Sequence, residues 1–588
     1  MVKWFKRKTV DISQLKAHPT LAGVGETALR ILTNRGFDTP EKVEKLLFSG
    51  IGDLHDPRLM KDAEKAVEII ERAIRNGEPI TVYGDYDADG VGSTVLMTKL
   101  LRKAGGTVHF FTNNRFIHGY GICPKGVDDM LALYPETKLI VTVDNGISAH
   151  AGINYAKEKG LTVVVTDHHD PAETLPDADA IVDPKRRDCE YPFKGLCGAG
   201  VAFKLMLLLY WNMGHELETV YTTMDIVALS TVADVVPLVD ENRIIVKKGL
   251  NMMESESRSV FRIFRQVTGV KTINAHHTIG MVYAPMINAI GRLDGDPRRA
   301  IEMFFEEEEE KIEETILYLK EVNERRKAMT VEQTEIAMES IEGVLDESTG
   351  TRSGGKGLQY VNVVYHPDFH EGIVGLIAGR LKEHYNRPFF VFTKEHGYLK
   401  GSGRGIDGFH LKEAMDKIKY LFKGYGGHAK ACGLSLEEAH LKTFEEEINR
   451  LAKECLTEDN FQKVKRIEIV LKPHECSLEL IDELKDLEPF GEAFPKPVLG
   501  IEDFFADSAF PIVKGSSQKV HYMRMGSEQQ HLKLKCGNLD LIVWGMSDNY
   551  IQMGAPKHIK AIGYPDINIW QDRVTVQFIV DNDNIRSA

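Results

Sequence analysis

The sequence lacks the marks of a disulfide-rich, zinc-ribbon or membrane protein. Its seven cysteines are scattered along 588 residues, and none of them forms a C-x-x-C pair, which argues against a disulfide framework and a zinc ribbon. No stretch reaches the ~20 uninterrupted apolar residues of a membrane span. The basic start MVKWFKRKTV lacks the apolar core of a signal peptide. We therefore expect a cytoplasmic protein that does not associate with membranes.

The sequence also lacks the excess of positive charge that is typical of nucleic-acid-binding proteins. Its formal net charge is -14, and much of the acidic excess lies in one block, Glu306–Glu310 with Glu313 and Glu314. A metal site requires acids of its own, and an acidic protein can still carry a basic groove. The net charge therefore does not exclude an enzyme that acts on nucleic acids.

The chain is too long for one hydrophobic core, and its patterns divide it into five parts. Residues 1–55 predict an N-terminal arm or cap. Residues 56–303 alternate β-branched strands with amphipathic helices, which predicts an α/β domain with a mostly parallel sheet. Residues 304–346 contain no proline and repeat apolar residues at helical spacing, which predicts a long linking helix. Residues 358–455 predict a smaller α/β domain, and residues 456–588 predict an OB-like β-barrel.

Five short motifs place polar side chains at the ends of apolar runs and together predict one metal site. They are VYGDYDADG (82–90), VTVDNG (141–146), VVVTDHH (163–169), STVADVVPL (230–238) and NAIGRL (288–293). A β-branched run predicts a buried parallel strand, and open α/β sheets bind ligands at the carboxyl ends of such strands. Carboxylates and imidazoles that converge there can hold two divalent cations, and paired cations suit phosphodiester hydrolysis.

The first motif is the most specific of the five. Asp85, Asp87 and Asp89 lie within five residues, and their carboxylates repel one another unless a cation holds them. Hard oxygen ligands at this density favour Mg²⁺ or Mn²⁺ over zinc. An EF-hand also alternates acids, but it requires a glutamate at its twelfth position, where this sequence has Leu96.

The other acids and histidines have less specific surroundings in the sequence. Asp144 follows a strand and could equally be a helix N-cap. Of the neighbours His168 and His169, one could bind metal while the other contacts substrate. Asp234 is a lone acid in an apolar run, where burial without a partner is costly, which favours a metal ligand or an ion-pair partner.

These motifs resemble motifs I to IV of the DHH phosphoesterase superfamily. Six flanking segments narrow the resemblance to the RecJ-like single-stranded-DNA-specific exonucleases. The segments are NRFIHGYG, INAIGRL, EGIVGLIAGRL, SGRG, YGGHAKACGL and LEPFGEAFPKPVL. The resemblance extends from about Leu54 to Pro497. It implies that 56–303 is the DHH phosphoesterase domain, 358–455 the DHH-associated domain and 456–588 an OB-like nucleic-acid-binding domain.

The resemblance also implies a set of site residues. Two divalent cations, Mn²⁺ or Mg²⁺, would be held by Asp85, Asp87, Asp89, Asp144, His168 and Asp234. The catalytic residues would be Asp144 as bridging ligand, His168, and His169 facing the scissile phosphate. The 5′-phosphate and the DNA would contact Arg115, Tyr120, Arg292, Ser402, Arg404 and His428. The allocation of the first motif's aspartates between the cations stays open, because Tyr83 stands where many superfamily members have a histidine.

The implied function is a metal-dependent 5′-to-3′ exonuclease that hydrolyses single-stranded DNA to 5′-mononucleotides in DNA repair or recombination. A single-strand-binding protein and a helicase are the candidate protein partners, and we expect a monomer. Phe116, Tyr120, Phe369 and Phe409 could stack on bases. Two alternatives are an oligonucleotide or cyclic-dinucleotide phosphodiesterase of the same superfamily, and a non-catalytic RecJ-like replication scaffold. The scaffold is disfavoured because every expected acid and histidine is present.

Overall fold

The computed structural model describes residues 2–8, 10–346, 351–395, 397–511, 517–571, 573–580 and 584–588. The chain forms two compact units. The smaller unit comprises Met1–Ser49, Gln462–Phe490 and Pro495–Ala588, and the larger comprises Gly50–Phe461 with Gly491–Phe494. The first residues of the chain therefore belong to the same unit as the last. No helix in the described ranges is both long and apolar enough to cross a membrane.

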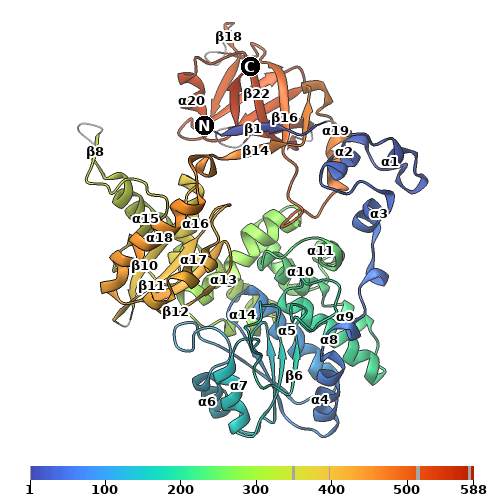
Figure 1. Cartoon of the computed structure of the whole chain (residues 1–588). Coiled ribbons are helices and arrows are strands. Elements are labelled where there is room, and N and C mark those ends of the chain that lie inside the picture. The colour runs from blue at the N-terminus through green and yellow to red at the C-terminus, as the bar shows by residue number, and fades with distance from the viewer. Residues whose placement is uncertain are drawn as a thin grey trace. The chain divides into compact units, whose positions relative to one another are not determined.

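The larger unit contains a five-stranded parallel sheet (Figure 1). Its strands are β2 (Ile80–Gly84), β3 (Val108–Thr112), β4 (Leu139–Val143), β5 (Thr162–Thr166) and β6 (Ala180–Val182). They lie in the order β3-β2-β4-β5-β6, and every neighbouring pair is parallel. The strands are apolar and almost entirely buried, as expected for a sheet that is covered on both faces. The predicted parallel sheet is confirmed.

Alternate residues of these strands enter two different hydrophobic cores. Val82 and Val141 lie in one core with α4, α5 and α8, whereas Tyr83 and Ile140 lie in the other with α6 and α7. This alternation follows from the two-residue period of a strand. The helices are α4 (Ala63–Arg75), α5 (Ala88–Lys103), α6 (Pro124–Leu133), α7 (His150–Glu158), α8 (Gly198–Met213), α9 (Glu218–Tyr221), α10 (Met224–Ala233) and α11 (Asp240–Glu254).

The strand order creates a switch point between β2 and β4. From β2 the chain moves to one side of the sheet to form β3, and it then returns to the other side of β2 to form β4. In doubly wound sheets, the crevice at the carboxyl ends of such a strand pair is the usual ligand site. Asp85 follows β2 and Asp144 follows β4, so the two acids flank this crevice.

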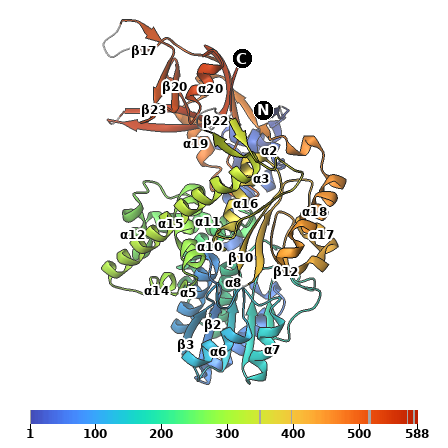
Figure 2. The same ribbon diagram turned by 90° about the vertical axis from the view of Figure 1, so that its left-hand side faces the viewer.

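A 34-residue helix, α15 (Glu309–Glu342), links two hydrophobic cores. Its N-terminal half places Ile312 and Ile316 in a core with α12 (Ser259–Thr268) and α13 (Ala284–Leu293). Its C-terminal half places Ala337 and Ile341 in a core with α16 (Val374–Tyr385), and Figure 2 shows α15 and α16 together. The predicted linking helix is confirmed. The short α14 (Arg298–Glu302) precedes α15, and β7 (Val344–Asp346) pairs with β8 (Thr351–Ser353) after it.

A second sheet in the larger unit has the order β12-β13-β11-β10-β9. Its strands are β9 (Asn362–Tyr365), β10 (Phe389–Glu395), β11 (Tyr398–Arg404), β12 (Phe422–Gly427) and β13 (Ala431–Leu436). Only β9 and β10 pair in parallel. Helices α17 (Leu411–Lys417) and α18 (Leu441–Cys455) contribute to its core. This is the smaller α/β fold that the sequence predicts.

The smaller unit is mainly β-structure. Its largest sheet has the order β15-β16-β22-β23-β21-β20-β19, with β24 beside β22. These strands are β15 (Ile469–Leu471), β16 (Leu499–Phe505), β19 (Tyr522–Met525), β20 (His531–Cys536), β21 (Leu539–Val543), β22 (His558–Trp570), β23 (Arg573–Val580) and β24 (Ile585–Ser587). The unit also contains α1 (Ser13–Ala17), α2 (Glu26–Asn34), α3 (Pro40–Phe48), α19 (Leu478–Lys485), α20 (Ser547–Gln552), and the strand pairs β1 (Lys3–Lys6) with β14 (Val464–Ile467) and β17 (Phe510–Pro511) with β18 (Lys519–Val520).

Candidate active site

The three aspartates of the first motif lie where β2 turns into α5. Asp85 is buried directly after β2, and Asp87 is the N-cap of α5, where its Oδ1 accepts the backbone N–H groups of Asp89 and Gly90, each at 3.0 Å. Position 90 requires glycine because a Cβ there would lie 2.6 Å from the backbone carbonyl of Asp85. Asn288 of the NAIGRL motif accepts the N–H of Ala88 at 2.8 Å. These contacts hold the turn and leave Oδ1 of Asp85 without a hydrogen-bond partner among the described residues.

Asp89 is anchored by the first turn of α8. Its carboxylate accepts the backbone N–H groups of Gly198 at 2.6 Å and Ala199 at 2.9 Å, an arrangement favoured by the positive end of the helix dipole. A Cβ on Gly198 would lie 2.5 Å from the Cβ of Asp144. The glycine therefore lets the helix approach two acids at once.

One ring nitrogen of His168 faces three carboxylates. Its Nε2 lies 3.0 Å from Asp144 Oδ1, 3.6 Å from Asp234 Oδ2 and 3.7 Å from Asp89 Oδ2. His168 follows β5, Asp144 follows β4 with a positive φ of 59°, and Asp234 is the C-cap of α10. Four segments that are far apart in the sequence therefore converge on one point.

The candidate ligand atoms form three overlapping groups. Within each group they lie within 4.8 Å of one another, and the groups are Asp85–Asp87–Asp144, Asp89–His168–Asp234 and Asp144–His168–His169. The fold therefore brings together all six residues that the sequence predicts as metal ligands. The donor set is mainly carboxylate oxygen, which suits Mn²⁺ or Mg²⁺.

The electrostatics of this cluster favour bound cations. Burial, followed by the neighbouring carboxylates, raises the pKa of Asp85, Asp144 and Asp234 well above the usual value and that of Asp89 to about 6. Burial lowers the pKa of His168 to about 3, which keeps its imidazole neutral and able to ligate.

Several ligand atoms in the cluster have no other role in the described structure. One carboxylate oxygen each of Asp85 and Asp144, and both ring nitrogens of His168, are buried without a hydrogen-bond partner among the described residues. Buried polar atoms are costly when they are unsatisfied, and divalent cations would satisfy them. The residues present therefore fit a pair of such ions.

His169 is held by a buried acid, Asp167, that the sequence analysis did not assign to the site. Asp167 Oδ1 lies 2.7 Å from His169 Nδ1 and accepts the backbone N–H of His168, while its Oδ2 accepts the N–H of Ile147 at 2.9 Å. Burial by itself lowers the pKa of His169, but the hydrogen bond to Asp167 and its charge outweigh burial and raise it to about 9. The Tyr120 hydroxyl lies 2.9 Å from the same nitrogen. The signal for Asp167 was its place beside the two histidines.

Arginines gather in a cavity of about 710 Å³ at the second sheet. It is lined by Arg115, Tyr120, Arg292, Ser402 and Arg404, among others. Arg404 Nη1 donates to Ser402 Oγ at 2.9 Å, and the Arg115 guanidinium lies over the Tyr86 ring, 5.1 Å from its centroid. Burial, followed by the charge of Arg115, lowers the pKa of Arg292 to about 10. None of the three arginines has an ion pair with an acid in the described ranges, so the cavity offers free positive charge to an anion.

Two glycines allow this cavity to form. A Cβ on Gly375 would lie 2.9 Å from Arg404 Nη2 and 3.1 Å from Ser402 Oγ, and one on Gly372 would lie 1.9 Å from the carbonyl oxygen of Arg292. Gly372 precedes α16 and Gly375 is its second residue, and both belong to the EGIVG segment. The sequence marked this segment by resemblance, but its physical role is visible only in the structure.

A second cavity, of about 1210 Å³, adjoins the first. His169 and His428 both line it, and the two cavities share Tyr120, Tyr425, Gly426 and Gly433. His428 Nδ1 lies 3.0 Å from Asp170 Oδ2, and so connects the second sheet to the loop that follows the DHH motif. All the predicted substrate-binding residues therefore line one of these two adjoining cavities.

The prediction of base stacking is wrong for two of the four aromatic residues. Phe369 and Phe409 are each only 4% exposed and belong to hydrophobic cores, so neither can stack on a base. Phe116 lines the arginine cavity, and Tyr120 is 53% exposed. Aromatics close to a functional motif are often part of the core beneath it, and the sequence does not separate the two cases.

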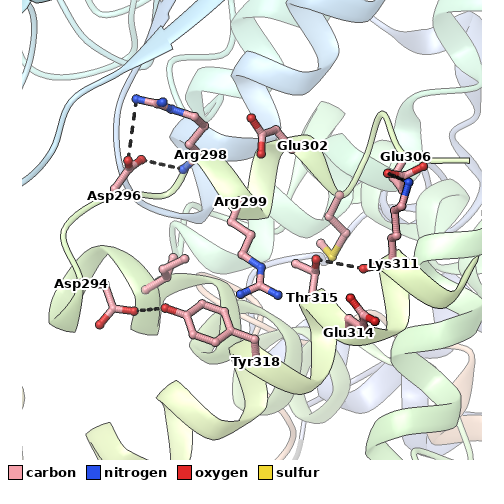
Figure 3. A pocket seen from close by; sticks show the side chains of 12 residues that line it. Asp294, Asp296, Arg298, Arg299, Glu302, Glu306, Lys311, Glu314, Thr315 and Tyr318 are labelled. Atoms are coloured by element: carbon pink, nitrogen blue, oxygen red, sulfur yellow. Dashed lines mark hydrogen bonds and ion pairs between the residues drawn. The ribbon is translucent and has the colours of Figure 1, made fainter. Parts of the chain in front are cut away.

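A separate cavity of about 570 Å³ lies among α13, α14 and α15 (Figure 3). The Arg299 guanidinium lies over the Tyr318 ring, 4.3 Å from its centroid, and the Tyr318 hydroxyl donates to Asp294. Both acids and bases line its wall, so it lacks the single sign of charge that a phosphate or metal site requires. None of the predicted site residues lines it.

Three family models match successive parts of the sequence. The DHH family N-terminal domain matches residues 79–231, the DHHA1 domain matches residues 357–454, and the RecJ OB domain matches residues 467–582. The first match contains five of the six candidate metal ligands, and Asp234 follows three residues after its end.

Relatives and solved structures agree with these matches. The single-stranded-DNA-specific exonuclease RecJ of Escherichia coli is 33% identical over 571 residues, which cover 94% of this chain and 95% of that protein. A crystal structure of RecJ from Thermus thermophilus in complex with Mn²⁺ has a TM-score of 0.81 and 25% identity, and covers 100% of this chain and 80% of that one. A structure of the same protein in complex with Mg²⁺ has a TM-score of 0.76, 23% identity and coverage of 100% and 79%.

Proposed function

Because the chain belongs to the RecJ family of single-stranded-DNA-specific exonucleases, we propose that it hydrolyses phosphodiester bonds of single-stranded DNA. One observation carries the proposal: in a single compact unit, a cluster of buried acids lies close to a cavity with three arginines that have no acidic partner among the described residues. The acids would hold cations at the reacting phosphate. The arginines would hold a second phosphate of the same strand.

The two cation sites follow from the grouping of the ligands. One ion would be held by Asp85, Asp87 and Asp144, and the other by Asp89, His168 and Asp234. Asp144 fits the bridging position because its Oδ1 is 3.0 Å from His168 Nε2, which belongs to the other group. Mn²⁺ or Mg²⁺ bound there would supply an activated water and neutralise charge on the attacking and leaving oxygens.

His169 is proposed to face the scissile phosphate. Asp167 fixes the orientation of its ring and favours the protonated imidazole by raising its pKa, so the side chain would present a positive charge to the cavity that it lines. Such a preorganised charge stabilises the negative charge that develops on the phosphate oxygens. Tyr120 lies against the same ring, between the two adjoining cavities.

The arginine cavity is proposed to bind the 5′-terminal phosphate. Arg115, Arg292 and Arg404 with Ser402 line one cavity and supply the paired N–H and O–H donors that the oxygens of a terminal phosphate accept. A strand anchored there by its end would be cut close to that end, which gives 5′-to-3′ polarity and release of 5′-mononucleotides. His428 would contact the strand in the neighbouring cavity.

Two other functions receive less support. An oligonucleotide or cyclic-dinucleotide phosphodiesterase does not require a third domain of the RecJ OB type, which this chain has at residues 467–582. A non-catalytic scaffold does not require the complete set of ligands that converges here. A role in DNA repair or recombination, a cytoplasmic location, a single-strand-binding protein or helicase partner, and a monomeric state stay predictions.

The test is a digestion of 5′-end-labelled and 3′-end-labelled oligonucleotides, single- and double-stranded, with and without a 5′-phosphate, in Mn²⁺ and in Mg²⁺. We expect mononucleotides to be released from the 5′ end of single strands only, with preference for a 5′-phosphate. A series of lengths discriminates the alternatives, because cleavage restricted to the shortest oligonucleotides would contradict an exonuclease. Activity that persists in EDTA would contradict the metal site.

A further inference from the structure

The start of the chain and a segment that follows the domain of the second sheet form a basic ribbon. In the smaller unit, β1 pairs in parallel with β14, and Lys3, Trp4, Phe5 and Lys6 lie opposite Val464, Lys465, Arg466 and Ile467 (Figure 1). Backbone hydrogen bonds extend the pairing at both ends, from Lys3 N to Lys463 O and from Arg7 N to Ile467 O. We call the segments 2–8 and 463–467 the β1/β14 ribbon.

The ribbon is strongly positive in a chain that is acidic as a whole. Its two segments contain seven lysines and arginines and no acid, whereas the chain has a net charge of -14. Lys6 pairs with Glu502. Arg7, Lys8, Lys463 and Arg466 are exposed and have no ion pair with any residue that the structure describes. Clustered cations of this kind create a positive surface potential that attracts anionic partners.

The two faces of the ribbon differ. Paired residues of parallel strands point to the same face, and successive residues alternate. Trp4 lies under the Arg586 guanidinium, 4.0 Å from the ring centroid, and Ile467 is buried, so that face packs on the unit. The opposite face carries Lys3, Phe5 and Arg466, all exposed, with Phe5 53% exposed.

An exposed aromatic ring between cations is a platform for a single-stranded nucleic acid. The cations bind phosphates, and the ring stacks on a base whatever its identity. An acidic protein segment would be attracted by the charge but would gain nothing from stacking on Phe5. β1 lies outside the three family matches, and β14 precedes the RecJ OB match except for Ile467.

We propose that the outward face of the β1/β14 ribbon is a second binding site for single-stranded DNA, distinct from the two cavities of the larger unit. That the bound strand is DNA rests on the proposed function. The chemistry of the ribbon alone would suit any single-stranded nucleic acid. The site would hold substrate that has not yet reached the acids.

The test measures binding of an oligothymidylate of about 30 nucleotides, roughly twice the site size of one OB fold, to the full chain in EDTA over a series of salt concentrations. The charge variant combines Arg7→Gln and Arg466→Gln, which remove two cations that the alternation places on the outward face. Each lost phosphate contact lowers the slope of log affinity against log salt by about 0.7, so we expect the slope to fall by about 1.4. Phe5→Ala should lower affinity about tenfold and leave the slope unchanged, because stacking releases no counterions.

Matched controls separate the ribbon from net charge. Lys42→Gln with Lys485→Gln removes two cations from the same unit that already pair with Asp38 and Asp482, at 2.7 and 2.9 Å, and should leave the slope unchanged. The charge variant should bind a polyphosphate of equal charge more weakly than the wild type, whereas Phe5→Ala should bind it with unchanged affinity. Thermal unfolding of each variant shows whether the ribbon still folds. Arg466→Lys alone keeps the charge and should keep the wild-type slope.

Wild-type slope and affinity in the charge variant would overturn the proposal. The proposal would be overturned even if the same variant, while binding DNA normally, lost affinity for an oligoglutamate peptide, because the ribbon would then bind acidic protein segments. An equal effect of Phe5→Ala on polyphosphate and on DNA would overturn the stacking platform. The proposed function is tested separately, by Mn²⁺-dependent release of nucleotides from the wild type, so the failure of one does not resemble the failure of the other.

Discussion

The acid cluster and the arginine cavity lie in the same unit and are built in opposite ways. The acid cluster gathers five carboxylates that repel one another. In the described chain this repulsion is offset only in part, by hydrogen bonds from the backbone and by the charges of His169, Arg115 and Lys185. The arginine cavity gathers three guanidiniums that remain charged. Arg404 and Arg292 donate to a hydroxyl and to carbonyl oxygens, so protein atoms orient them.

This difference teaches which half of the site depends on its ligand. Carboxylates can shed their charge by taking up protons, and their raised pKa values show that burial favours this. Guanidiniums do not lose their charge near neutral pH, even when burial lowers the pKa to about 10, as at Arg292. Without cations the acid cluster should therefore be strained and sensitive to pH, whereas the arginine cavity should already have its working charge.

The largest expected effect is the loss of activity in Asp144→Ala. This substitution removes the acid common to two ligand groups, and we expect Mn²⁺-dependent nuclease activity to fall by about 10³-fold or more. In EDTA the variant should unfold at a temperature at least as high as the wild type, because one repelling carboxylate is gone. Asp177→Ala, at an exposed aspartate of the same α/β region, is the control. Activity near the wild-type level in Asp144→Ala would refute the metal centre.

The second expected effect concerns the stability of the metal-free protein. Burial raises the folded-state pKa of Asp89 from 3.8 to about 6. The folded state therefore holds this proton more tightly than the unfolded state, and the contribution present at about pH 4 is lost as the pH rises through 6. Asp89 alone accounts for about 3 kcal/mol, because each pKa unit is worth about 1.4 kcal/mol. The other raised carboxylates act in the same direction.

Thermal unfolding of EDTA-treated protein at about pH 5 and pH 8 measures this effect. We expect a lower unfolding temperature at pH 8, and recovery when Mn²⁺ is added, since binding stabilises the folded state. The arginine cavity should contribute no dependence in this range. Higher stability at pH 8 than at pH 5 without metal would mean that the acids do not repel one another as described.

The same comparison separates what the sequence predicted from what it did not. The acids and His168 were predictable because β-branched runs predict parallel strands and polar residues at their carboxyl ends must meet at one edge. The contacts that orient them were not. Gly198 donates to Asp89 across 109 residues, and such a backbone donor leaves no mark in residue type or spacing.

The arginine cavity was predictable only through family resemblance. Nothing about an isolated Arg115 or Arg404 distinguishes a phosphate ligand from a surface ion pair, and the cavity exists because Gly372 and Gly375 leave room for them. Burial of Phe369 was not foreseen for the same reason, because tertiary packing decides it. The pairing of Lys3 with Val464 joins residues that are far apart in the sequence, which no local pattern indicates.

The third expected effect tests the arginine cavity by itself. Arg404→Lys keeps the charge but loses the planar fork that donates to Ser402 and to the backbone. We expect kcat/KM for a 5′-phosphorylated single strand to fall about 10- to 100-fold, with little change for the 5′-hydroxyl strand and no change in Mn²⁺ affinity. Arg450→Lys on α18, an exposed arginine paired with Glu447 and Glu454, is the control. An equal loss on both strands would assign Arg404 to general DNA binding instead of the 5′ end.

The smallest expected effect tests whether a buried side chain outside the ligand set positions the acid cluster. The side chain of Asn242 is fully buried and its Nδ2 donates to Gly195 O at 2.6 Å and Pro237 O at 3.0 Å. Gly195 precedes the turn of α8 that binds Asp89, and Pro237 follows Asp234 by three residues. Asn242 therefore ties together the segments that position two ligands of one cation group. In Asn242→Ser the shorter side chain cannot span both carbonyls, and we expect about tenfold weaker Mn²⁺ activation with near-normal kcat at saturating metal.

Asn449 provides a matched control for this substitution. Its Nδ2 donates to two carbonyls, Val361 O at 2.8 Å and Glu445 O at 3.0 Å, in the domain of the second sheet. Asn449→Ser should lower stability in a similar way, by about 1 to 3 kcal/mol for the carbonyls left unpaired, and leave Mn²⁺ activation unchanged. If both variants lose stability and neither shifts the Mn²⁺ concentration for half-maximal activity, Asn242 supports the fold alone, and the acid cluster keeps its geometry without the tie between its two loops.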